Sequence, residues 1–530
     1  MKIFVADDVS AAGLEPLRVA GFTVEKRTGL VADELREAVR DCDGLIVRSE
    51  TKVTSELMDA ASRLRVVGRA GVGVDNIDVA QATARGIVVM NAPDGNTITT
   101  AEHTIALLIS LARRVPQANG SLRAGRWERK RFIGVELQGK TLGIVGLGRI
   151  GRVVASRARA FGMNIVAYDP FVAPDQARDL ELEIAPLDEV FARADFLTVH
   201  TPLTAETRGI VGSQAFSKMK RGVRIINCAR GGLVDERALL AAIKEGIVAG
   251  AALDVFEQEP PPADHPLLAL DEVIATPHLG ASTTEAQEGV ALTVAEQMRD
   301  YLSTGALRGA VNVPALGTQE LNALQPYIKL AESLGRFQAQ LIDEAAVREV
   351  CLEYAGDVAE LDAAPVTRAF LAGLLRYMSA RVNVVNAFLI AEERGIEVIA
   401  SYKRAGSEFA PAIRTRVITT NGEQVVAGTL FGGPGHSGDG RITEINGFRI
   451  EAIPHGHMLV TRNHDVPGVI GRIGSILGEH SVNISRFHLG RRERGGEAMA
   501  VIETDAPLKD ETLNELRSFE QVISARQIEL

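Results

Sequence analysis

Two kinds of hydrophobic pattern alternate along the first part of the chain. Short apolar runs at residues 2–8, 44–50, 64–71 and 86–93 are typical of buried strands, and amphipathic stretches such as 32–40 and 54–62 are typical of helices. Strands that alternate with helices favour a parallel sheet whose faces are covered by helices. We therefore predict a first α/β unit at the start of the chain.

The same alternation begins again after a long helical stretch, with strand patterns at 140–148, 164–170, 196–202, 223–232, 249–255 and 272–280. Thr99 with Glu102, and Ser282 with Glu285, have the spacing of a helix capping box, so they predict one long helix before this second unit and one after it. Two flanking helices suggest that the second unit is inserted into the first. The two crossings would form a hinge over a cleft.

The pattern changes again after Pro314. Residues 317–452 contain one predicted long helix at 367–395 and a predicted hairpin with its turn at Asn421 and Gly422, but no motif that carries chemistry. The end of the chain has the order strand, helix, strand, strand, helix, strand of a ferredoxin-like module. The predicted domains are 1–98 with 285–314, then 99–284, 315–453 and 454–530.

Composition narrows the class of protein. The chain has 530 residues, of which 46% are hydrophobic and 24% charged, so several globular domains are expected. A net charge of -10 gives no overall field for a nucleic acid, and the apolar stretch 101–112 is too short to span a bilayer. Three widely spaced cysteines favour a reducing compartment. We expect a cytoplasmic protein without a nucleic-acid partner, a membrane partner or a metal site.

A glycine motif marks the second unit as a candidate dinucleotide site. Gly146, Gly148 and Gly151 follow an apolar strand and open a helix, where free N–H groups and the helix dipole attract a pyrophosphate. Asp169, at the end of the next strand, can accept hydrogen bonds from ribose hydroxyls and would repel a 2′-phosphate, and Pro170 follows in place of an arginine. The pattern predicts NAD; the alternative is a purely structural glycine turn.

The stretch 68–76 of the first unit resembles this motif but lacks its third glycine, because Asn76 stands three residues after Gly73. We interpret Gly71 and Gly73 as part of a loop at a strand end that offers backbone N–H groups to a substrate carboxylate.

Three side chains outside the glycine motif are candidates for catalysis. Arg230 follows a buried strand and precedes two glycines, His278 lies just past another strand end, and Glu259 stands on a loop stiffened by three prolines. Transfer of a hydride from an alcohol to NAD needs a base for the hydroxyl proton, and a carboxylate beside a histidine fixes its tautomer. Each residue also has a structural alternative: a solvated arginine, or a histidine and a glutamate that serve only the fold.

Six motifs together resemble the D-isomer-specific 2-hydroxyacid dehydrogenases: GLGRIG (146–151), YDP (168–170), HTPLTAETRG (200–209), NCARGGLVDE (227–236), AALDVFEQEP (251–260) and PHLGAST (277–283). The resemblance implies that Arg230 binds the substrate carboxylate and polarises the C2 oxygen, that His278 moves the proton and that Glu259 holds His278. It also implies a wider set of NAD contacts: Arg149, Ile150, Thr201, Pro202, Cys228, Asp254 and Gly280. Among these, Asp254 is expected to face the nicotinamide carboxamide.

The whole chain is similar to the long members of that family. These combine a Rossmann NAD-binding domain, inserted into a flavodoxin-like substrate domain, with an intervening domain and a ferredoxin-like ACT domain, and they oxidise 3-phosphoglycerate to phosphohydroxypyruvate on the route to L-serine. A substrate with a phosphate and a carboxylate needs several cations, and arginine suits a phosphate. The expected substrate contacts are Arg48, Ser49, Arg69, Gly71, Val72, Gly73 and Asn96.

Two other functions stay open at this stage. One is a glyoxylate or hydroxypyruvate reductase of the same family, and the other is an NAD-sensing corepressor-like binding protein. In addition, residues 460–491 resemble an ACT domain, which implies that Asp465 and Asn483 bind L-serine between paired subunits of a homo-oligomer, expected to be a tetramer. The alternative is that Asp465 only ends a strand and that Asn483 only caps a turn.

Overall fold

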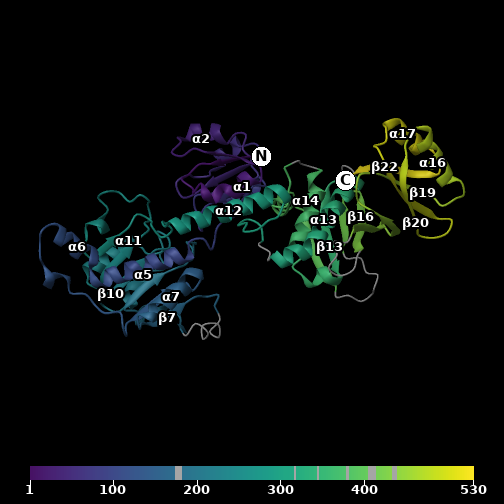
Figure 1. Ribbon diagram of the computed structural model, residues 1–530. Helices are drawn as coiled ribbons and strands as arrows, with labels where there is room; N and C mark the ends of the chain where they lie inside the picture. The colour runs from purple at the N-terminus through teal and green to yellow at the C-terminus, as the bar shows by residue number, and fades with distance from the viewer. Residues whose placement is uncertain (173–181, 315–317, 343–344, 378–380, 404–412, 432–438) are drawn as a thin grey trace.

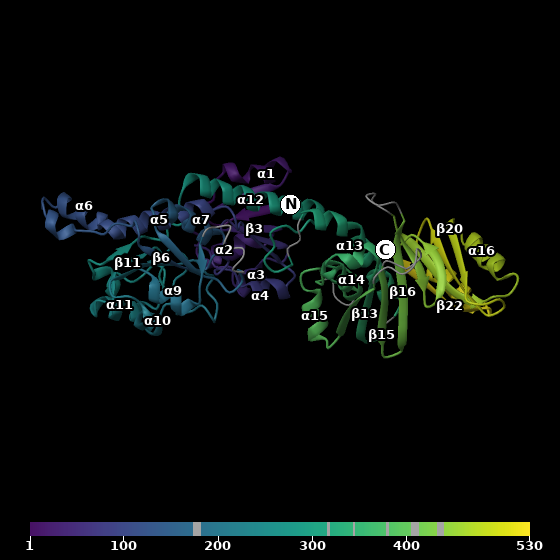
Figure 2. The same cartoon turned by 90° about the horizontal axis from the view of Figure 1, so that it is seen from below.

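The computed structural model describes residues 1–172, 182–314, 318–342, 345–377, 381–403, 413–431 and 439–530. Its four sheets belong to four units that follow one another along an elongated molecule (Figures 1 and 2). The blue-to-teal and purple units lie at one end, the green unit lies in the middle and the yellow unit lies at the other end. Within the described ranges, no helix is both long enough and apolar enough to cross a membrane.

The first sheet has five parallel strands in the flavodoxin-like order β2-β1-β3-β4-β5. The central strand β3 is buried at every residue, which explains why it is a continuous apolar run and not an alternating one. The elements are β1 (Lys2–Val5), η1 (Ala12–Leu14), α1 (Glu15–Val19), β2 (Thr23–Lys26), α2 (Ala32–Val39), β3 (Gly44–Val47), α3 (Ser55–Ala60), β4 (Val66–Arg69), α4 (Val79–Ala84) and β5 (Val88–Asn91).

Helix α12 (Thr284–Thr304) follows the second sheet in sequence but packs on the first. Its residues Val290, Val294 and Met298 share a buried cluster with Ile3 and Val66. The chain therefore leaves the first unit, builds the second and returns. This confirms the predicted insertion.

The two crossings between the units lie side by side, because Thr99 Oγ1 and Thr283 Oγ1 are 3.3 Å apart. Both helices begin near the predicted positions but not at them. Helix α5 (Thr97–Arg113) starts two residues before Thr99. Helix α12 is capped by Thr283, whose Oγ1 accepts a hydrogen bond from Ala286 N, and not by Ser282.

The second sheet has seven parallel strands in the order β12-β11-β10-β9-β6-β7-β8. The strand order reverses between β6 and β9, and sheets of this Rossmann type bind ligands at that point, beyond the carboxyl ends of the strands. The elements are α5, α6 (Val115–Arg123), η2 (Arg129–Phe132), β6 (Thr141–Val145), α7 (Arg149–Ala160), β7 (Asn164–Tyr168), β8 (Glu183–Ile184), α9 (Leu187–Arg193), β9 (Phe196–Val199), α10 (Ser213–Lys218), β10 (Val223–Asn227), α11 (Glu236–Lys244), β11 (Val248–Leu253), η3 (Pro266–Ala269) and β12 (Val273–Ala275).

The third sheet has six strands in the order β14-β13-β15-β16-β17-β18, and all pairs except β13 with β14 are antiparallel. The predicted hairpin is confirmed, because Thr419 pairs with Gly422 across the turn. The elements are α13 (Thr318–Leu341), β13 (Val347–Ala355), η4 (Gly356–Glu360), α14 (Ala364–Arg376), α15 (Ala387–Glu393), β14 (Glu397–Lys403), β15 (Ile413–Thr419), β16 (Gly422–Phe431), β17 (Asp439–Ile445) and β18 (Phe448–Ala452).

The single helix predicted over 367–395 is wrong. Helix α14 ends at Arg376 and α15 begins at Ala387, and the described residues 381–386 between them form no helix. The apolar pattern continues through this segment for another reason. Val385 is buried against the core of the first unit. Asn383 Nδ2 donates a hydrogen bond to Gly86 O of the first unit at 2.8 Å.

The fourth sheet has four antiparallel strands in the order β20-β21-β19-β22. Residues alternate between its two faces: Leu459 and Ile502 pack under the helices, whereas Met458 and Val501 belong to the core of the third unit. The predicted ferredoxin-like module is confirmed. Its elements are β19 (His457–His464), α16 (Val469–Glu479), β20 (Ile484–Arg491), β21 (Glu497–Thr504), α17 (Asp510–Ser518) and β22 (Val522–Glu529).

Candidate active site

A cavity of about 470 Å³ lies between the first two units, at the carboxyl ends of their strands. Cavities between domains and at the switch points of α/β sheets are common ligand sites. Most of the predicted site residues line this cavity: Arg48, Ser49, Arg69, Val72, Gly73 and Asn96 from the first unit, and Arg149, Ile150, Thr201, Pro202, Cys228, Arg230, His278 and Gly280 from the second.

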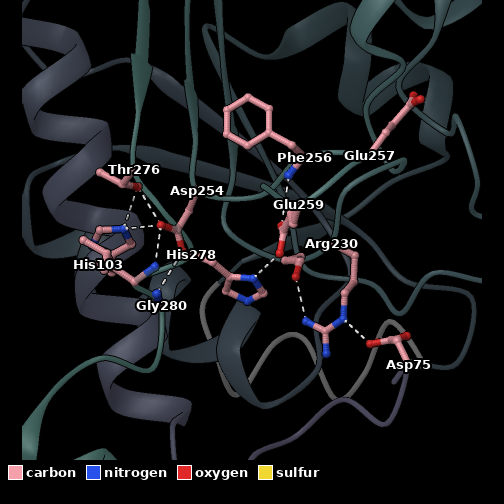
Figure 3. Close-up of polar contacts among 12 residues, drawn as sticks. Asp75, His103, Arg230, Asp254, Phe256, Glu257, Glu259, Thr276, His278 and Gly280 are labelled. Atoms are coloured by element: carbon pink, nitrogen blue, oxygen red, sulfur yellow. Dashed lines mark hydrogen bonds and ion pairs between the residues drawn. The ribbon is translucent and has the colours of Figure 1, made fainter. Parts of the chain in front are cut away.

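His278 and Glu259 form a hydrogen-bonded pair beside the cavity (Figure 3). The distance from His278 Nδ1 to Glu259 Oε2 is 2.7 Å, and Glu259 Oε1 accepts a hydrogen bond from Phe256 N at 3.1 Å. Desolvation raises the pKa of Glu259, but the hydrogen bond and charge of His278 outweigh it, so the pKa lies below its ordinary value. Because the ionised Glu259 accepts the Nδ1 proton, Nε2 is the nitrogen left for a substrate.

The loop after β10 places Arg230 at the cavity. Asn227, which is buried, holds this loop by donating to Arg230 O at 2.9 Å and accepting from Ala229 N at 3.0 Å. A Cβ at Gly231 would lie 1.8 Å from Phe256 O, so only glycine lets this loop approach the loop after β11. Gly231 therefore serves close packing, and the arginine is the chemical group that the loop presents.

Three guanidinium groups gather at the first unit's side of the cavity: Arg48, Arg69 and Arg230. Burial, together with the charges of Arg230 and Arg48, lowers the pKa of Arg69 to about 10. Arg69 Nε is buried and has no hydrogen-bond partner in the described part of the chain. Such a cluster of positive charge is suited to an anion with more than one negative group.

The glycines of the first unit's loop make room for these arginines. A Cβ at Gly71 would lie 1.6 Å from a terminal nitrogen of Arg69, and a Cβ at Gly73 would lie 1.9 Å from a terminal nitrogen of Arg230. Gly73 lines the cavity, whereas Gly71 is not among its lining residues. The sequence interpretation assigned these glycines to backbone N–H contacts; their packing shows in addition that they seat two guanidinium groups.

The glycine motif of the second unit has the geometry of a dinucleotide site. Gly146 has φ of +96°, and a Cβ at Gly151 would lie 2.2 Å from Gly146 O. A Cβ at Gly148, directly before helix α7, would meet no atom within 4 Å. Asp169 Oδ2 accepts a hydrogen bond from Leu147 N at 2.8 Å. The turn and the packing thus require two of the glycines, and the third leaves open space at a helix N-terminus for a pyrophosphate.

We expect alanine to have different effects at the two ends of this motif. Gly148→Ala should weaken NADH binding about tenfold at unchanged thermal stability, because its Cβ enters only the ligand's space. Gly151→Ala should lower the free energy of unfolding by about 1–3 kcal/mol, because it forces α7 away from β6. Fluorescence titration with NADH and calorimetric melting measure the two effects. Equal melting temperatures for the two variants would contradict this account.

Asp254 is 1% exposed and lies close to His103, Thr276 and Gly280 (Figure 3). Its carboxylate accepts hydrogen bonds from Thr276 Oγ1, Leu279 N and Gly280 N, and His103 Nε2 lies 3.1 Å away. Burial raises the pKa of Asp254, but its hydrogen bonds, that with His103 first among them, lower the pKa by more. The pKa of Asp254 therefore lies below its ordinary value. In this arrangement Asp254 shapes the loop that carries His278, and it is not among the residues that line the cavity.

Several cavity residues were not found from the sequence. His200 lines the cavity, and burial lowers its pKa to about 4, so it is neutral. Thr100, which donates to Gly280 O at 2.8 Å, and Asp75 also line it. His103 holds Asp254 from outside the lining. The sequence signal for His103 was its place on an otherwise apolar helix, where a buried polar group requires a partner.

Three family models match this chain. The model described as "D-isomer specific 2-hydroxyacid dehydrogenase, NAD binding domain" matches residues 105–280. A "D-3-phosphoglycerate dehydrogenase intervening domain" matches 323–446, and an ACT domain matches 457–521.

The D-3-phosphoglycerate dehydrogenase of Bacillus subtilis strain 168 is 44% identical to this chain, over 100% of the chain and 99% of that protein. The protein of the same name from Archaeoglobus fulgidus is 42% identical, over 100% of both. The chain belongs to the D-3-phosphoglycerate dehydrogenase family. The resemblance seen in the sequence is thereby confirmed, and as a member of this family the protein is an NAD-dependent oxidoreductase.

A solved structure shows where the family departs from shorter dehydrogenases. The crystal structure of a glyoxylate reductase from Paecilomyes thermophila is similar with a TM-score of 0.54 and 33% identity. The similarity covers 98% of that chain but 59% of this one. The relatives of the D-3-phosphoglycerate dehydrogenase family, in contrast, extend over the intervening and ACT domains as well.

Proposed function

We propose that the protein oxidises 3-phospho-D-glycerate to 3-phosphohydroxypyruvate with NAD, the first step of the phosphorylated route to L-serine. The observation that carries this proposal is one cavity lined by Arg149 and Ile150 of the glycine loop, by three further arginines and by His278, which is paired with Glu259. A hydroxy acid that carries both a carboxylate and a phosphate needs several arginines, and its oxidation needs a base such as His278. We also propose that the domain boundaries are those predicted from the sequence.

The loop 146–151 and Asp169 would hold NAD, which would supply the hydride acceptor for C2 of the substrate. The substrate's hydroxyl proton would pass to Nε2 of His278, whose other nitrogen is already bound to Glu259 at 2.7 Å. Loss of the proton and of the hydride turns the hydroxyl group into a ketone. Arg230 would donate hydrogen bonds to the oxygen of this ketone. In the reverse direction the same histidine returns the proton, by microscopic reversibility.

The anionic ends of the substrate account for the remaining side chains. Arg230 would bind the carboxylate together with the backbone of Val72 and Gly73. Arg48 and Arg69 would bind the phosphate, with Ser49 and Asn96 as neutral donors. Arg69 supports this role because its Nε is buried without a partner, a cost that an anionic ligand would remove.

Turnover distinguishes this proposal from its two rivals. We expect NADH to be oxidised with phosphohydroxypyruvate at a kcat/KM at least about 100-fold above that with hydroxypyruvate or glyoxylate, because the arginines of the cavity would lack their anionic partner without the phosphate. A preference for glyoxylate would support a reductase of that type. Binding of NADH without turnover of any of these acids would support an NAD-sensing binding protein.

We further propose that L-serine binds at the ACT domain and inhibits the enzyme. The predicted effector residues already have partners: Asp465 accepts from Gly495 N at 3.0 Å and from Arg491 at 3.3 Å, and Asn483 donates to Asp505 at 2.6 Å. A serine ammonium and carboxylate would share or replace these bonds. Coupling of about 1–3 kcal/mol to the cleft is typical, and by linkage substrate would weaken serine binding equally if the effect is on affinity.

Asp465→Ala or Asn483→Ala should abolish inhibition by millimolar L-serine and leave the uninhibited rate unchanged, because neither residue lies in the second unit. Initial rates against serine concentration, with calorimetry of serine binding, test this. Asp510→Ala, in the exposed first turn of α17, is the control and should stay inhibitable. A wild-type enzyme that neither binds serine nor slows in its presence would reject the feedback proposal.

We also propose that the protein is cytoplasmic and forms a homotetramer with paired ACT domains. Sedimentation equilibrium tests the number of subunits in this assembly.

A further inference from the structure

Asp75 lies on the opposite side of the cleft from the residue that it binds. It belongs to the loop after β4 of the first unit, whereas Arg230 follows β10 of the second, 155 residues later. Arg230 Nε donates to Asp75 Oδ2 at 2.9 Å. In Figure 3, Asp75 lies on the side of Arg230 that faces away from His278. The pair therefore bridges the two units without standing between the arginine and the histidine.

The loop that carries Asp75 is held firmly. Asn76, the next residue, donates through Nδ2 to Arg48 O at 2.8 Å and to Thr51 O at 2.6 Å. Its own carbonyl accepts from Val53 N at 2.8 Å. These three hydrogen bonds of Asn76 hold the backbone from which the side chain of Asp75 extends.

Two hydrogen bonds on different nitrogens orient the Arg230 guanidinium. Asp75 takes Nε, and Ala229 O accepts from the first terminal nitrogen at 2.7 Å. The second terminal nitrogen lies over Gly73, where a Cβ would approach it to 1.9 Å. A planar group bound at two of its nitrogens has little freedom to rotate, so its remaining N–H groups keep one direction in the cavity.

Fold stability does not explain this ion pair. The side chain of Asp75 is 64% exposed and that of Arg230 is 29% exposed, and ion pairs at such surfaces add little to stability. What the pair does achieve is orientation of a group whose direction matters for chemistry. We propose that Asp75 is a positioning residue, which holds Arg230 across the cleft so that its free N–H groups meet the substrate's carboxylate and C2 oxygen. This inference rests on the proposed function.

The test combines truncation, conservative replacement and a double-mutant cycle. Asp75→Ala should lower kcat/KM for phosphohydroxypyruvate about 10- to 50-fold, with more of the loss in kcat than in KM, since small misplacements of catalytic groups reduce rates strongly. Asp75→Asn keeps an oxygen that accepts from Nε and should stay within about threefold of wild type. In an Arg230→Ala background, Asp75→Ala should change the rate by less than about twofold, because it acts only through Arg230.

Asp59 provides a matched control in the same unit. It is 63% exposed and binds Nε of Arg85 at 2.8 Å, and neither residue lines the cavity. Asp59→Asn should leave all kinetic constants unchanged. Circular dichroism establishes that each variant is folded, and Asp75→Glu, which displaces the carboxylate by one methylene, gives a second measurement with an expected loss of severalfold.

The results separate the inference from the proposed function. A wild-type enzyme that turns over none of the acids rejects the function. With an active wild type, the inference is overturned if Asp75→Ala stays within twofold, if Asp75→Asn is as slow as Asp75→Ala, or if Asp75→Ala costs as much without Arg230 as with it.

Discussion

Replacement of Arg230 by alanine is expected to lower kcat/KM for phosphohydroxypyruvate by about 100- to 1000-fold, the usual cost of removing a donor aimed at developing charge. The fold should stay intact, because the guanidinium is held only by Asp75 and the Ala229 carbonyl among described residues, and Asn227 maintains the loop without it. Steady-state kinetics with both phosphohydroxypyruvate and NADH measure the effect. KM for NADH should change little.

Arg193→Ala is a suitable control for this prediction. Arg193 also lies in the second unit and binds Glu183 and Glu189, but these pairs are exposed and none of the three residues lines the cavity. Its removal should leave the kinetics unchanged. An Arg230→Ala enzyme that works at a rate close to wild type would remove Arg230 from the mechanism.

The second large effect is expected at His278. His278→Gln should reduce kcat by about 100- to 10,000-fold, because no base remains to take the hydroxyl proton. The pH dependence should change with the rate: wild-type oxidation of 3-phosphoglycerate releases a proton and gains from alkaline pH, whereas the residual rate of the variant should lose the part of this dependence that belongs to the base. Rates from pH 6 to pH 10 test both expectations.

A second histidine–glutamate pair allows a direct comparison. His480 Nε2 lies 2.8 Å from Glu515 in the ACT domain, with similar partial exposure. His480→Gln should leave kcat and its pH dependence unchanged. If His278→Gln retained more than about a tenth of the wild-type kcat, another group would have to be the base.

How much of the site the sequence predicts depends on how local each interaction is. Gly151 could be interpreted because the packing that it permits, against Gly146 O, lies within the same short motif. The close approach of Gly146 to His200 is not local and was not predicted. The bond between His278 and Glu259, 19 residues apart, was expected from the family resemblance, because both residues stand in motifs that carry it. Asp75 was not found, because nothing near it in sequence reveals a partner 155 residues away.

The errors in the third unit have a similar physical origin. Helix α13 was missed, and Pro326 inside it is a residue that normally argues against a helix interior. The opposite error, one helix in place of α14 and α15, arose because Val382 and Val385 are apolar and buried. Val385 is buried by the first unit and not by its own helical neighbours. Periodicity reports that a residue is buried, but it does not report which part of the molecule covers it.

The second apolar face of the ACT sheet has a consequence for what counts as a domain in this protein. Met458, Val460, Met499, Val501 and Ile528 lie in one continuous interior with residues of α13, α14 and β13. The matches to the intervening and ACT models stop at 446 and start at 457, so the border between them falls in the part of the chain that closes this shared interior. The two modules match separate family models but share one apolar interior in the folded chain. A displacement at the ACT sheet would therefore act on the interior of the third unit, which also contacts the first unit through Asn383 and Val385.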